Sequence, residues 1–366
     1  MDDSALNNYM SSAIEKLVFN AISSTIRNPK ETIFLMKYLF AGRKANRKRA
    51  ESESFGLHIP AFLICSITTS CNLFCTGCYA RANKICCENK PEEILSNKRW
   101  AEIFMEAQDI GISFILLAGG EPLLNREIIK QAARSKNVIF PIFTNGTILD
   151  EVYIELFKNN RNLIPVVSLE GDENRTDSRR GAGTHSKIEN TLKKLKDIKV
   201  LYGISITMTG ENLEEVSSDD FIAHLHKKGC RIVFFIEYVP IADDTEHLTL
   251  KDKEREFLDE RQNKLRLQFK DIIFLSFPGD EKFMGGCLAA GRGFFHVNPY
   301  GKAEPCPFSP YSDIDLKTDN LINALQSPLF AEIKNLNLIA GEHNGGCSLF
   351  EHDDQIKELM DSSMIK

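Results

Sequence analysis

The sequence predicts an α/β fold arranged as a barrel or partial barrel of six strand–helix units. Between about residues 60 and 240, short apolar runs rich in β-branched and aromatic residues alternate with segments at helical spacing. Continuous apolar runs of this kind are typical of parallel strands buried on both faces. Six strand–helix units are more than a simple three-layer fold suggests, and they therefore favour a barrel. The runs are residues 61–69, 114–118, 138–144, 163–170, 201–209 and 232–240.

A stretch of unusual composition follows each predicted strand directly. The first is the cysteine-rich TTSCNLFCTGCYARANKICC, and the others read GGEP, TNGT, SLEG, TGEN and EYVP. In α/β barrels, the loops after the strands share one face, and that face carries the active site. We therefore expect the six loops to converge on one pocket.

Two amphipathic helices are predicted before the barrel, over residues 12–28 and 31–42, within an N-terminal helical extension of residues 1–57. The basic run GRKANRKRAE follows the second helix. We interpret this run as a solvated turn, and contact with a phosphate, an acidic partner or a membrane surface stays open.

Composition excludes several classes of protein. The chain of 366 residues is 43% hydrophobic and 26% charged, and its net charge of -6 gives no general case for a nucleic-acid partner. No stretch approaches the ~20 apolar residues of a membrane span, and the N-terminus lacks a secretory pattern. Ten cysteines without an export signal favour ligand thiols over disulfides. We expect a cytoplasmic protein.

Three cysteines form a C-x3-C-x2-C pattern after the first strand, namely Cys71, Cys75 and Cys78. A closed zinc site takes four ligands, so the fourth would come from Cys86, Cys87 or a distant residue. A [4Fe–4S] cluster is normally held by four cysteines, so three would leave one iron open for a small molecule. We assign Cys65, Cys86 and Cys87 to packing or to no specific role.

At these residues the sequence resembles the radical S-adenosylmethionine (SAM) superfamily, and the resemblance covers roughly residues 58–240. The family signature is C-x3-C-x2-C after the first strand of a partial (β/α)6 barrel. Its second motif, which binds the SAM amino group, matches Gly119, Gly120, Glu121 and Pro122. The glycines would let the backbone approach the ligand, and a carboxylate pairs with an ammonium. The resemblance implies a SAM-binding [4Fe–4S] cluster and S-adenosyl-L-methionine as cofactors.

Further SAM-binding residues follow from the resemblance alone. Asn145, Ser168 and Glu170 occupy strand ends that touch SAM in relatives, although the family often has Asp where this chain has Glu170. Arg180, in DSRRGAG, is a candidate partner for the SAM carboxylate, with a solvated surface position as the alternative. Three other polar residues are candidates for SAM contacts, but a role in the core or as a helix cap suits them at least as well. These are Thr207, Thr209 and Asn212.

The chain departs from the family at one position of the cysteine loop. Family members usually place an aromatic residue just before the third cysteine, where this sequence has Gly77. We expect Tyr79, two residues later, to take over the packing against the adenine.

A second cysteine group lies near the C-terminus. Cys287, Gly301 and Cys306 resemble the C-x9–15-G-x4-C opening of SPASM and twitch modules, which carry an auxiliary [4Fe–4S] cluster. A full SPASM module has seven cysteines, so the resemblance implies a twitch-like module with Cys347 as third ligand. Zinc and purely structural cysteines stay open. The fourth ligand also stays open, among Cys230, His343, His352, an oxygen ligand and an exchangeable site.

The predicted domains are residues 1–57, the barrel at 58–250, and a linker helix with the auxiliary module at 251–366. We expect the alternation of strands and helices to stop after about residue 250, at the charged segment KDKEREFLDERQNKLRLQF.

The resemblance implies an enzyme that cleaves SAM reductively and abstracts hydrogen from a substrate C–H bond. We favour oxidation or cross-linking of a peptide or protein side chain, and a sugar, nucleotide or lipid precursor is the alternative substrate. A flavodoxin or ferredoxin type of electron donor is implied, and membrane-surface contact through the N-terminus stays open. A non-catalytic zinc-binding scaffold is the alternative of another class.

Overall fold

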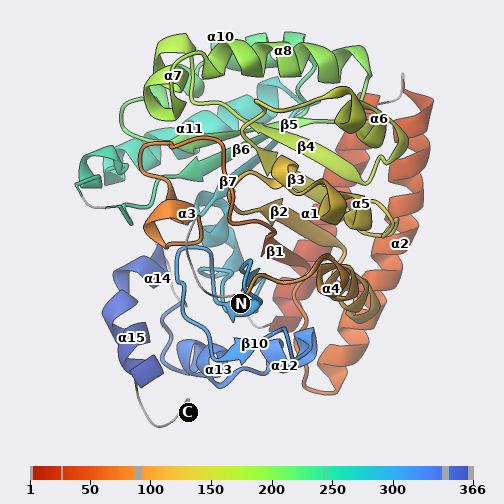
Figure 1. Cartoon of the computed structure of the whole chain (residues 1–366), viewed down its shortest axis with the longest axis vertical. Coiled ribbons are helices and arrows are strands. Elements are labelled where there is room, and N and C mark those ends of the chain that lie inside the picture. The colour runs from red at the N-terminus through yellow and green to blue at the C-terminus, as the bar shows by residue number, and fades with distance from the viewer. Residues whose placement is uncertain (1–2, 26–27, 87–92, 243, 340–345, 362–366) are drawn as a thin grey trace.

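The computed structural model of the chain describes residues 3–25, 28–86, 93–242, 244–339 and 346–361. Its strands form one ten-stranded sheet in the order β10-β9-β8-β1-β2-β3-β4-β5-β6-β7, and helices wrap its outside (Figure 1). Neighbouring strands from β1 to β7 run parallel. The strands are β1 (Phe62–Ser66), β2 (Phe114–Ala118), β3 (Phe140–Thr144), β4 (Leu163–Ser168), β5 (Gly203–Met208), β6 (Ile232–Glu237), β7 (Ile273–Phe277), β8 (His296–Val297), β9 (Lys302–Glu304) and β10 (Ile314–Asp315).

The helices begin and end at residues suited to those positions. For example, the Ser96 side chain accepts a hydrogen bond from the backbone of Arg99 at the start of α4, and Gly111 ends that helix in the left-handed conformation. The helices are α1 (Asp3–Thr25), α2 (Pro29–Ser54), α3 (Tyr79–Ala82), α4 (Asn97–Ile110), η1 (Pro122–Leu124), α5 (Arg126–Ala132), α6 (Glu151–Asn159), α7 (Glu173–Arg180), α8 (Thr184–Asp197), α9 (Leu213–Val216), α10 (Asp219–Lys228), η2 (Glu246–Leu248), α11 (Asp252–Gln268), η3 (Gly279–Met284), α12 (Leu321–Leu325), α13 (Pro328–Asn335), α14 (Ser348–Glu351) and α15 (Asp353–Asp361).

The predicted fold class is confirmed. All six apolar runs form parallel strands, and amphipathic helices cover the outward face of the sheet. Leu192 and Leu195 of α8 and Leu225 of α10 belong to the same buried cluster as Val167 and Phe235 of the strands. The burial of these helical stripes against the strands is what the alternating sequence pattern reflects.

The prediction that the strand pattern stops near residue 250 was wrong. The charged helix α11 leads into a seventh parallel strand, β7, which pairs with β6 in the register Ile232↔Ile273. Few residues of α11 are buried, among them Leu258 and Leu265, so its apolar stripe is narrow. For this reason its sequence resembles that of a linker helix. The apolar run after it, DIIFLSF, was the signal for the strand.

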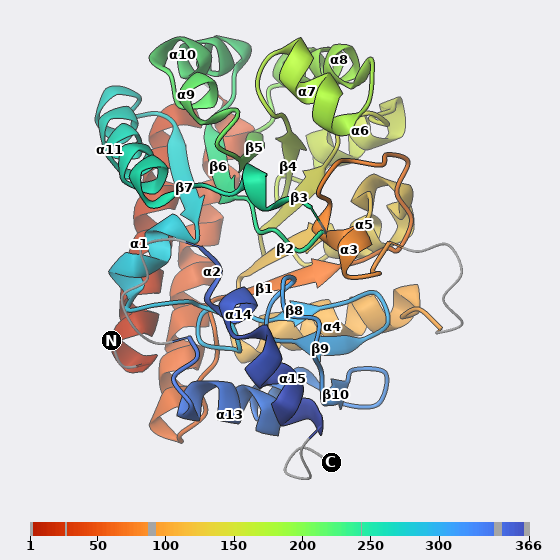
Figure 2. The same cartoon turned by 90° about the vertical axis from the view of Figure 1, so that its left-hand side faces the viewer.

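The C-terminal segment extends the same sheet at its other edge. Strand β8 pairs in parallel with β1, and β9 and β10 continue the sheet with antiparallel pairing (Figure 2). The polypeptide on either side of residue 250 therefore contributes to one sheet, and the division into three domains stays a prediction.

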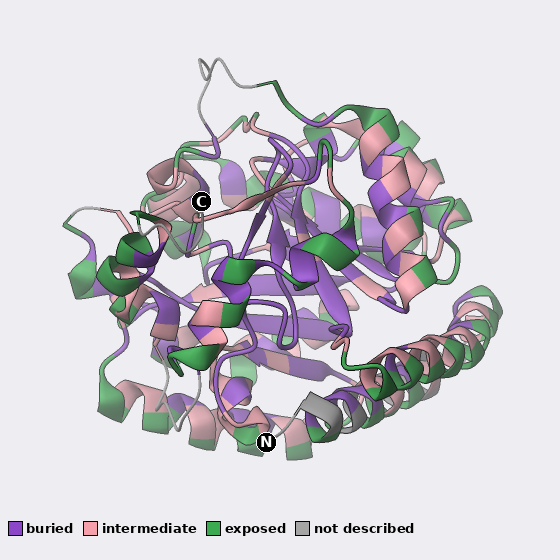
Figure 3. Ribbon diagram, turned by 90° about the horizontal axis from the view of Figure 1, so that it is seen from below, coloured by how far each residue is buried: buried purple, intermediate pink, exposed green. Residues whose placement is uncertain are grey.

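The N-terminal helices cover the end of the barrel where the strands begin. The strands in the interior are mostly buried, and the surrounding helices expose one side to solvent (Figure 3). The Tyr38 hydroxyl donates to the carbonyl of Ser113 just before β2, at 2.9 Å. The buried Glu31 carboxylate accepts from the backbone of Leu201, before β5, and from Arg161, before β4, both at 2.8 Å. A second buried cluster joins α1 and α2 to the strands. It includes Val18, Ala21, Leu35, Tyr38, Ile164, Val166, Ile232, Phe234 and Ile273.

The interpretation of the basic run as a solvated turn was wrong, because the run lies inside α2, which is longer than predicted. Arg49 points inward and is almost fully buried, and it donates to the carbonyl of Gly111 and to the hydroxyl of Ser11. Burial lowers the pKa of Arg49 to about 10. Among the described helices, none is long and apolar enough to cross a membrane.

Arg49 makes a testable contribution to stability. Arg49→Met would remove both hydrogen bonds and leave the Gly111 carbonyl without this donor, so we expect a loss of about 2–4 kcal/mol in the free energy of unfolding. Arg47→Met, at an exposed position of the same helix, is the matched control and should change it by less than about 0.5 kcal/mol. Urea unfolding followed by circular dichroism measures both, and equal losses would contradict the buried role of Arg49.

Candidate functional site

The cysteine loop after β1 is fixed to the Gly-Gly-Glu-Pro turn after β2 by backbone contacts. The backbone of Gly120 donates to the carbonyl of Thr68 at 3.0 Å, and that of Glu121 donates to Ser70 at 2.8 Å. Gly119 has a φ of +128°, and a Cβ there would lie 2.7 Å from the Thr68 oxygen. A Cβ at Gly120 would overlap the Ser70 carbonyl. Only glycines allow this approach, so the two motifs form one unit.

Two further strand ends contact the cysteine loop. The backbone of Thr76 donates to the carbonyl of Arg179, at the end of α7, at 2.9 Å. Tyr238, just after β6, lies over Gly77, where a Cβ would overlap the tyrosine ring. Gly77 also has a φ of +66°, which favours glycine. The space that an aromatic residue at position 77 would use is therefore filled by Tyr238 from another loop.

Tyr238 is a site residue that the sequence reasoning missed. Its side chain is buried, and its hydroxyl has no hydrogen-bond partner among the described residues. An unpaired buried hydroxyl beside the cysteine loop is a ready contact for a bound ligand. The segment EYVP was noted at this strand end, but its tyrosine was not singled out because its contact with Gly77 spans 161 positions.

The three thiols of the loop are free, partly buried and close enough to influence one another. Burial raises the pKa of Cys71 and of Cys75, and the guanidinium groups of Arg180 and Arg179 oppose this rise at Cys75. Within the described residues, no three Cys, His, Asp or Glu side chains surround a single metal ion. In an iron–sulfur cluster each thiolate binds a different iron, so the ligands lie farther apart than around a single metal ion. Three free thiols beside the guanidinium groups of Arg179 and Arg180 fit such a cluster.

Glu121 is buried, and its carboxylate accepts hydrogen bonds from groups of the protein itself. It accepts from the backbone of Leu123 at 3.0 Å, from the Thr144 hydroxyl at 2.7 Å and from the backbone of Asn145 at 2.7 Å. Burial raises the pKa of Glu121 despite these hydrogen bonds. The side chain thus joins the ends of β2 and β3, and its contact with the SAM amino group stays a prediction. Pro122 begins η1 directly after it.

Asn145 connects the third strand end to the cysteine loop. Its amide nitrogen donates to Asn72 at 2.9 Å, and its amide oxygen accepts from the backbone of Thr147 at 2.9 Å. Asn72 lies between Cys71 and Cys75, so Asn145 lies beside the thiols as expected. Its contact with SAM stays a prediction.

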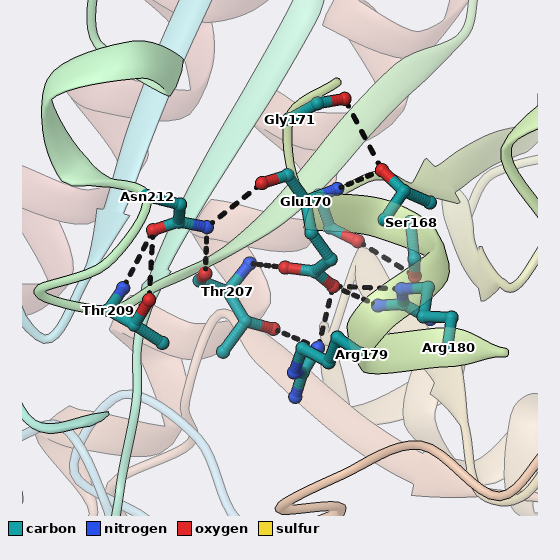
Figure 4. A network of polar contacts seen from close by, with 10 residues as sticks. Ser168, Glu170, Gly171, Arg179, Arg180, Thr207, Thr209 and Asn212 are labelled. Atoms are coloured by element: carbon teal, nitrogen blue, oxygen red, sulfur yellow. Dashed lines mark hydrogen bonds and ion pairs between the residues drawn. The ribbon is translucent and has the colours of Figure 1, made fainter. Parts of the chain in front are cut away.

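The predicted residues of the fourth and fifth strand ends meet in one polar network (Figure 4). The buried Glu170 carboxylate accepts from Arg179 at 2.6 Å, from Arg180 at 2.8 Å and from the backbone of Thr207 at 3.1 Å. Asn212 donates to the carbonyls of Glu170 and Thr207, at 3.1 and 2.9 Å, and accepts from the backbone of Thr209 at 2.9 Å.

This network carries an excess of positive charge toward the thiols. One carboxylate faces two guanidinium groups, and Nε of Arg179 is buried without a partner in the described chain. The solvated alternative for Arg180 was wrong, because this side chain is largely buried against Glu170. Its pairing with the SAM carboxylate stays a prediction, as does a ligand role for Ser168, whose hydroxyl bonds that of Ser205 at 3.1 Å.

Tyr79 faces the C-terminal segment. Its ring packs edge-on against Phe308, with centroids 5.3 Å apart. Burial raises the pKa of its hydroxyl, and Cys78, Cys86 and Cys306 are close enough to raise it further. Tyr79 therefore separates the two cysteine groups, and its proposed packing against adenine stays a prediction.

A chain of buried hydrogen bonds fixes the C-terminal segment to β1. His296 Nε2 is 2.8 Å from the Ser66 hydroxyl, and its Nδ1 is 2.7 Å from the Glu304 carboxylate. Asn298 donates to the other oxygen of Glu304 at 2.5 Å. Ser66 is the last residue of β1, and Glu304 ends β9 two residues before Cys306. The second cysteine group is thus held at a defined place beside the first.

The second group consists of Cys287, Cys306 and Cys347, which are all close enough to the buried Glu281 carboxylate to feel its charge. Burial raises the pKa of all three thiols, that of Cys347 to about 12, and Glu281 raises each further. Glu281 lies on η3 and is only 4% exposed. Sequence reasoning missed it, because its nearness to Cys347 depends on the tertiary fold.

The other candidates for the fourth ligand lie at different places in the structure. Cys230 donates to the carbonyl of Ile232 at 3.1 Å, at the start of β6 and therefore at the opposite end of the barrel, so this candidate was wrong. His343 lies outside the described residues, as does Cys87, and His352 follows α14. Gly301 has a φ of +89° in the turn between β8 and β9, as its predicted hairpin role requires.

Comparisons with known proteins agree with this geometry. Residues 65–222 match the model of the Radical SAM superfamily. The chain is 30% identical over 169 residues to the sporulation killing factor maturation protein SkfB of Bacillus subtilis (strain 168), covering 45% of this chain but only 40% of SkfB. It is 24% identical over 276 residues to the AdoMet-dependent heme synthase of Methanosarcina barkeri, covering 69% and 78% of the two chains.

The fold also matches a solved structure. Streptococcus suis SuiB bound to its precursor peptide SuiA superposes with a TM-score of 0.66 at 18% identity, covering 93% of this chain and 81% of that one. Residues 65–222 are therefore similar to the radical SAM superfamily, a family of enzymes, and the fold is shared with SuiB.

The Glu170 network predicts a loss of stability in acid. Burial alone would raise the pKa of Glu170, but Arg179 and Arg180 outweigh it and hold that pKa below its usual value. The stabilisation is complete above the unfolded-state pKa of about 4.3 and is lost as the pH falls through the lower folded-state pKa.

Glu170→Gln should therefore lower the free energy of unfolding by about 3–5 kcal/mol at pH 7, because it leaves two guanidinium groups without their carboxylate. In acid the loss should be much smaller. Glu173→Gln, at an exposed position of α7, is the control. Urea unfolding from pH 7 down to pH 3 measures the difference, and a cost that does not depend on pH would contradict this role.

Proposed function

We propose that this protein is a radical SAM enzyme in which Cys71, Cys75 and Cys78 hold a [4Fe–4S] cluster that binds SAM. The observation that carries the proposal is the fixed backbone contact between the three-thiol loop and the Gly-Gly-Glu-Pro turn. When bound, the cluster supplies the electron that cleaves SAM to methionine and a 5′-deoxyadenosyl radical, which abstracts hydrogen from a substrate C–H bond.

The residues around the loop have distinct proposed roles. The backbone of Gly119 and Gly120 approaches the ligand, while the buried Glu121 keeps that turn in place. Arg179 and Arg180 supply positive charge for anionic groups, because a single carboxylate cannot neutralise both. Tyr238 offers an apolar ring and a free hydroxyl, which suit the adenosine part of SAM.

The second cysteine group is proposed to hold an auxiliary [4Fe–4S] cluster in a twitch-like or SPASM-like module. Cys287, Cys306 and Cys347 would be its ligands, and Glu281 is the nearby buried oxygen donor for its fourth position. Three free thiols close together inside the protein support a bound metal cluster, because thiolates are the ligands of iron–sulfur clusters.

The proposed substrate is a peptide or protein side chain, which is oxidised or cross-linked. The likeness to a maturation protein and the fold shared with a peptide-bound SuiB support this class. The likeness to an AdoMet-dependent heme synthase keeps a small molecule as the second candidate. We propose reduction by a flavodoxin or ferredoxin type of donor in the cytoplasm.

Counting iron in variants tests both sites. After anaerobic reconstitution, we expect about eight iron per chain. Cys75→Ser should retain about four and lose SAM cleavage, whereas Cys306→Ser should also retain about four but still form 5′-deoxyadenosine. Glu281→Gln should lose iron only at the auxiliary site, and Cys230→Ala is the matched control that keeps all of it. A colourless protein with stoichiometric zinc would instead support the scaffold alternative.

The role of Tyr238 predicts weaker SAM binding in a variant without the ring. Tyr238→Leu should raise the Kd of SAM roughly 10-fold, since a buried aromatic contact contributes about 1 kcal/mol or more. Calorimetric titration of the reconstituted protein measures the Kd, with iron counted in parallel and Tyr9→Leu, at an exposed position, as control. A fall in iron without a change in Kd would mean that Tyr238 only holds the loop.

A further inference from the structure

The outward side of α2 carries exposed apolar residues that belong to neither of the two buried clusters. Ile33 is 54% exposed, Met36 50% and Phe40 67%. Residues three and four apart lie on one face of an α-helix, so the three form a continuous stripe. The hydrogen bonds Ser11–Asn46 and Glu15–Arg43 set α1 antiparallel to α2, which brings Phe19, itself 50% exposed, opposite Phe40.

Exposed cations share the face of these apolar residues. Lys37, Lys44 and Arg47 are exposed, and at 100° per residue they fall with Ile33, Met36 and Phe40 within a sector of about 100°. In this part of the helix the acidic residue is Glu31, which is buried on the opposite side. We name this face the docking stripe. It consists of Ile33, Met36, Lys37, Phe40, Lys44 and Arg47.

The docking stripe faces away from the barrel. The buried residues of α2, including Leu35 and Tyr38, contact the ends where the strands begin, and the stripe lies on the other side of the helix. The functional loops lie where the strands end. A surface bound at the stripe would therefore leave the candidate site open to its substrate.

We propose that the docking stripe binds the surface of a membrane that contains anionic lipids, with α1 and α2 lying in the interface. An apolar stripe with cations at its border is suited to this position, because the apolar side chains enter the acyl boundary and the cations meet lipid phosphates. The chain as a whole carries a net charge of -6, so the positive stripe also sets its orientation. A second copy of the chain fits less well, since a symmetric contact would bring like charges together.

Vesicle flotation of the full chain tests the proposal. At low salt the protein should float with vesicles of phosphatidylglycerol and phosphatidylcholine, but not with phosphatidylcholine alone, and high salt should weaken the binding. The combined change Lys37→Gln, Lys44→Gln and Arg47→Gln should lower the partition constant about 100-fold, at roughly 5-fold for each charge. The combined change Ile33→Ser, Met36→Ser and Phe40→Ser should lower it at least about 10-fold.

The matched control removes exposed apolar side chains elsewhere. Phe257→Ser with Leu267→Ser on α11 should leave binding unchanged, and circular dichroism checks that each variant is folded. Three results would overturn the proposal: no binding to anionic vesicles at low salt, an equal loss in the α11 control, or a dimer in sedimentation equilibrium that the apolar variant dissociates. The test does not involve SAM chemistry, so its outcome is separate from that of the proposed function.

Discussion

The close backbone approach between the cysteine loop and the Gly-Gly-Glu-Pro turn is the constraint on which the rest of the site depends. Two hydrogen bonds, from Gly120 to Thr68 and from Glu121 to Ser70, hold the loops of neighbouring strands at a distance that no side chain permits. Glu121 then ties this pair to the third strand end through Thr144 and the backbone of Asn145. The thiols therefore take their place from main-chain geometry, which varies less than side-chain conformation.

The buried charges around the loop are balanced only in part, because one carboxylate faces two guanidinium groups. Glu170 is stabilised as a carboxylate by two arginines, and the surplus cation lies toward Cys75, whose pKa is raised by burial. Such a site is prepared for anionic groups, since a buried cation with an unpaired N–H stabilises a negative partner. The network that shapes the protein thus also supplies the electrostatics that the proposed cofactors require.

The two cysteine groups belong to one structural unit. The hydrogen-bonded chain from Ser66 through His296 to Glu304 connects β1 with the hairpin that ends at Cys306, and Tyr79 fills the space between the groups together with Phe308. At the other end of the barrel, α1 and α2 cover the strand beginnings and present the docking stripe outward. Substrate chemistry and surface attachment would therefore occupy opposite ends of one sheet.

The sequence by itself determined the features that depend on near neighbours. The apolar runs specified six parallel strands, and the spacing of Cys71, Cys75 and Cys78 with the later Gly-Gly-Glu-Pro motif predicted the candidate site, because strand periodicity and cysteine spacing are local properties. Only the tertiary structure decided that Tyr238 covers Gly77, that Arg49 is buried within a basic run, that α11 leads to a seventh strand, and that Glu281 comes near cysteines distant in the sequence. Each of these depends on contacts between residues far apart in the chain, and burial follows from packing that no short pattern encodes.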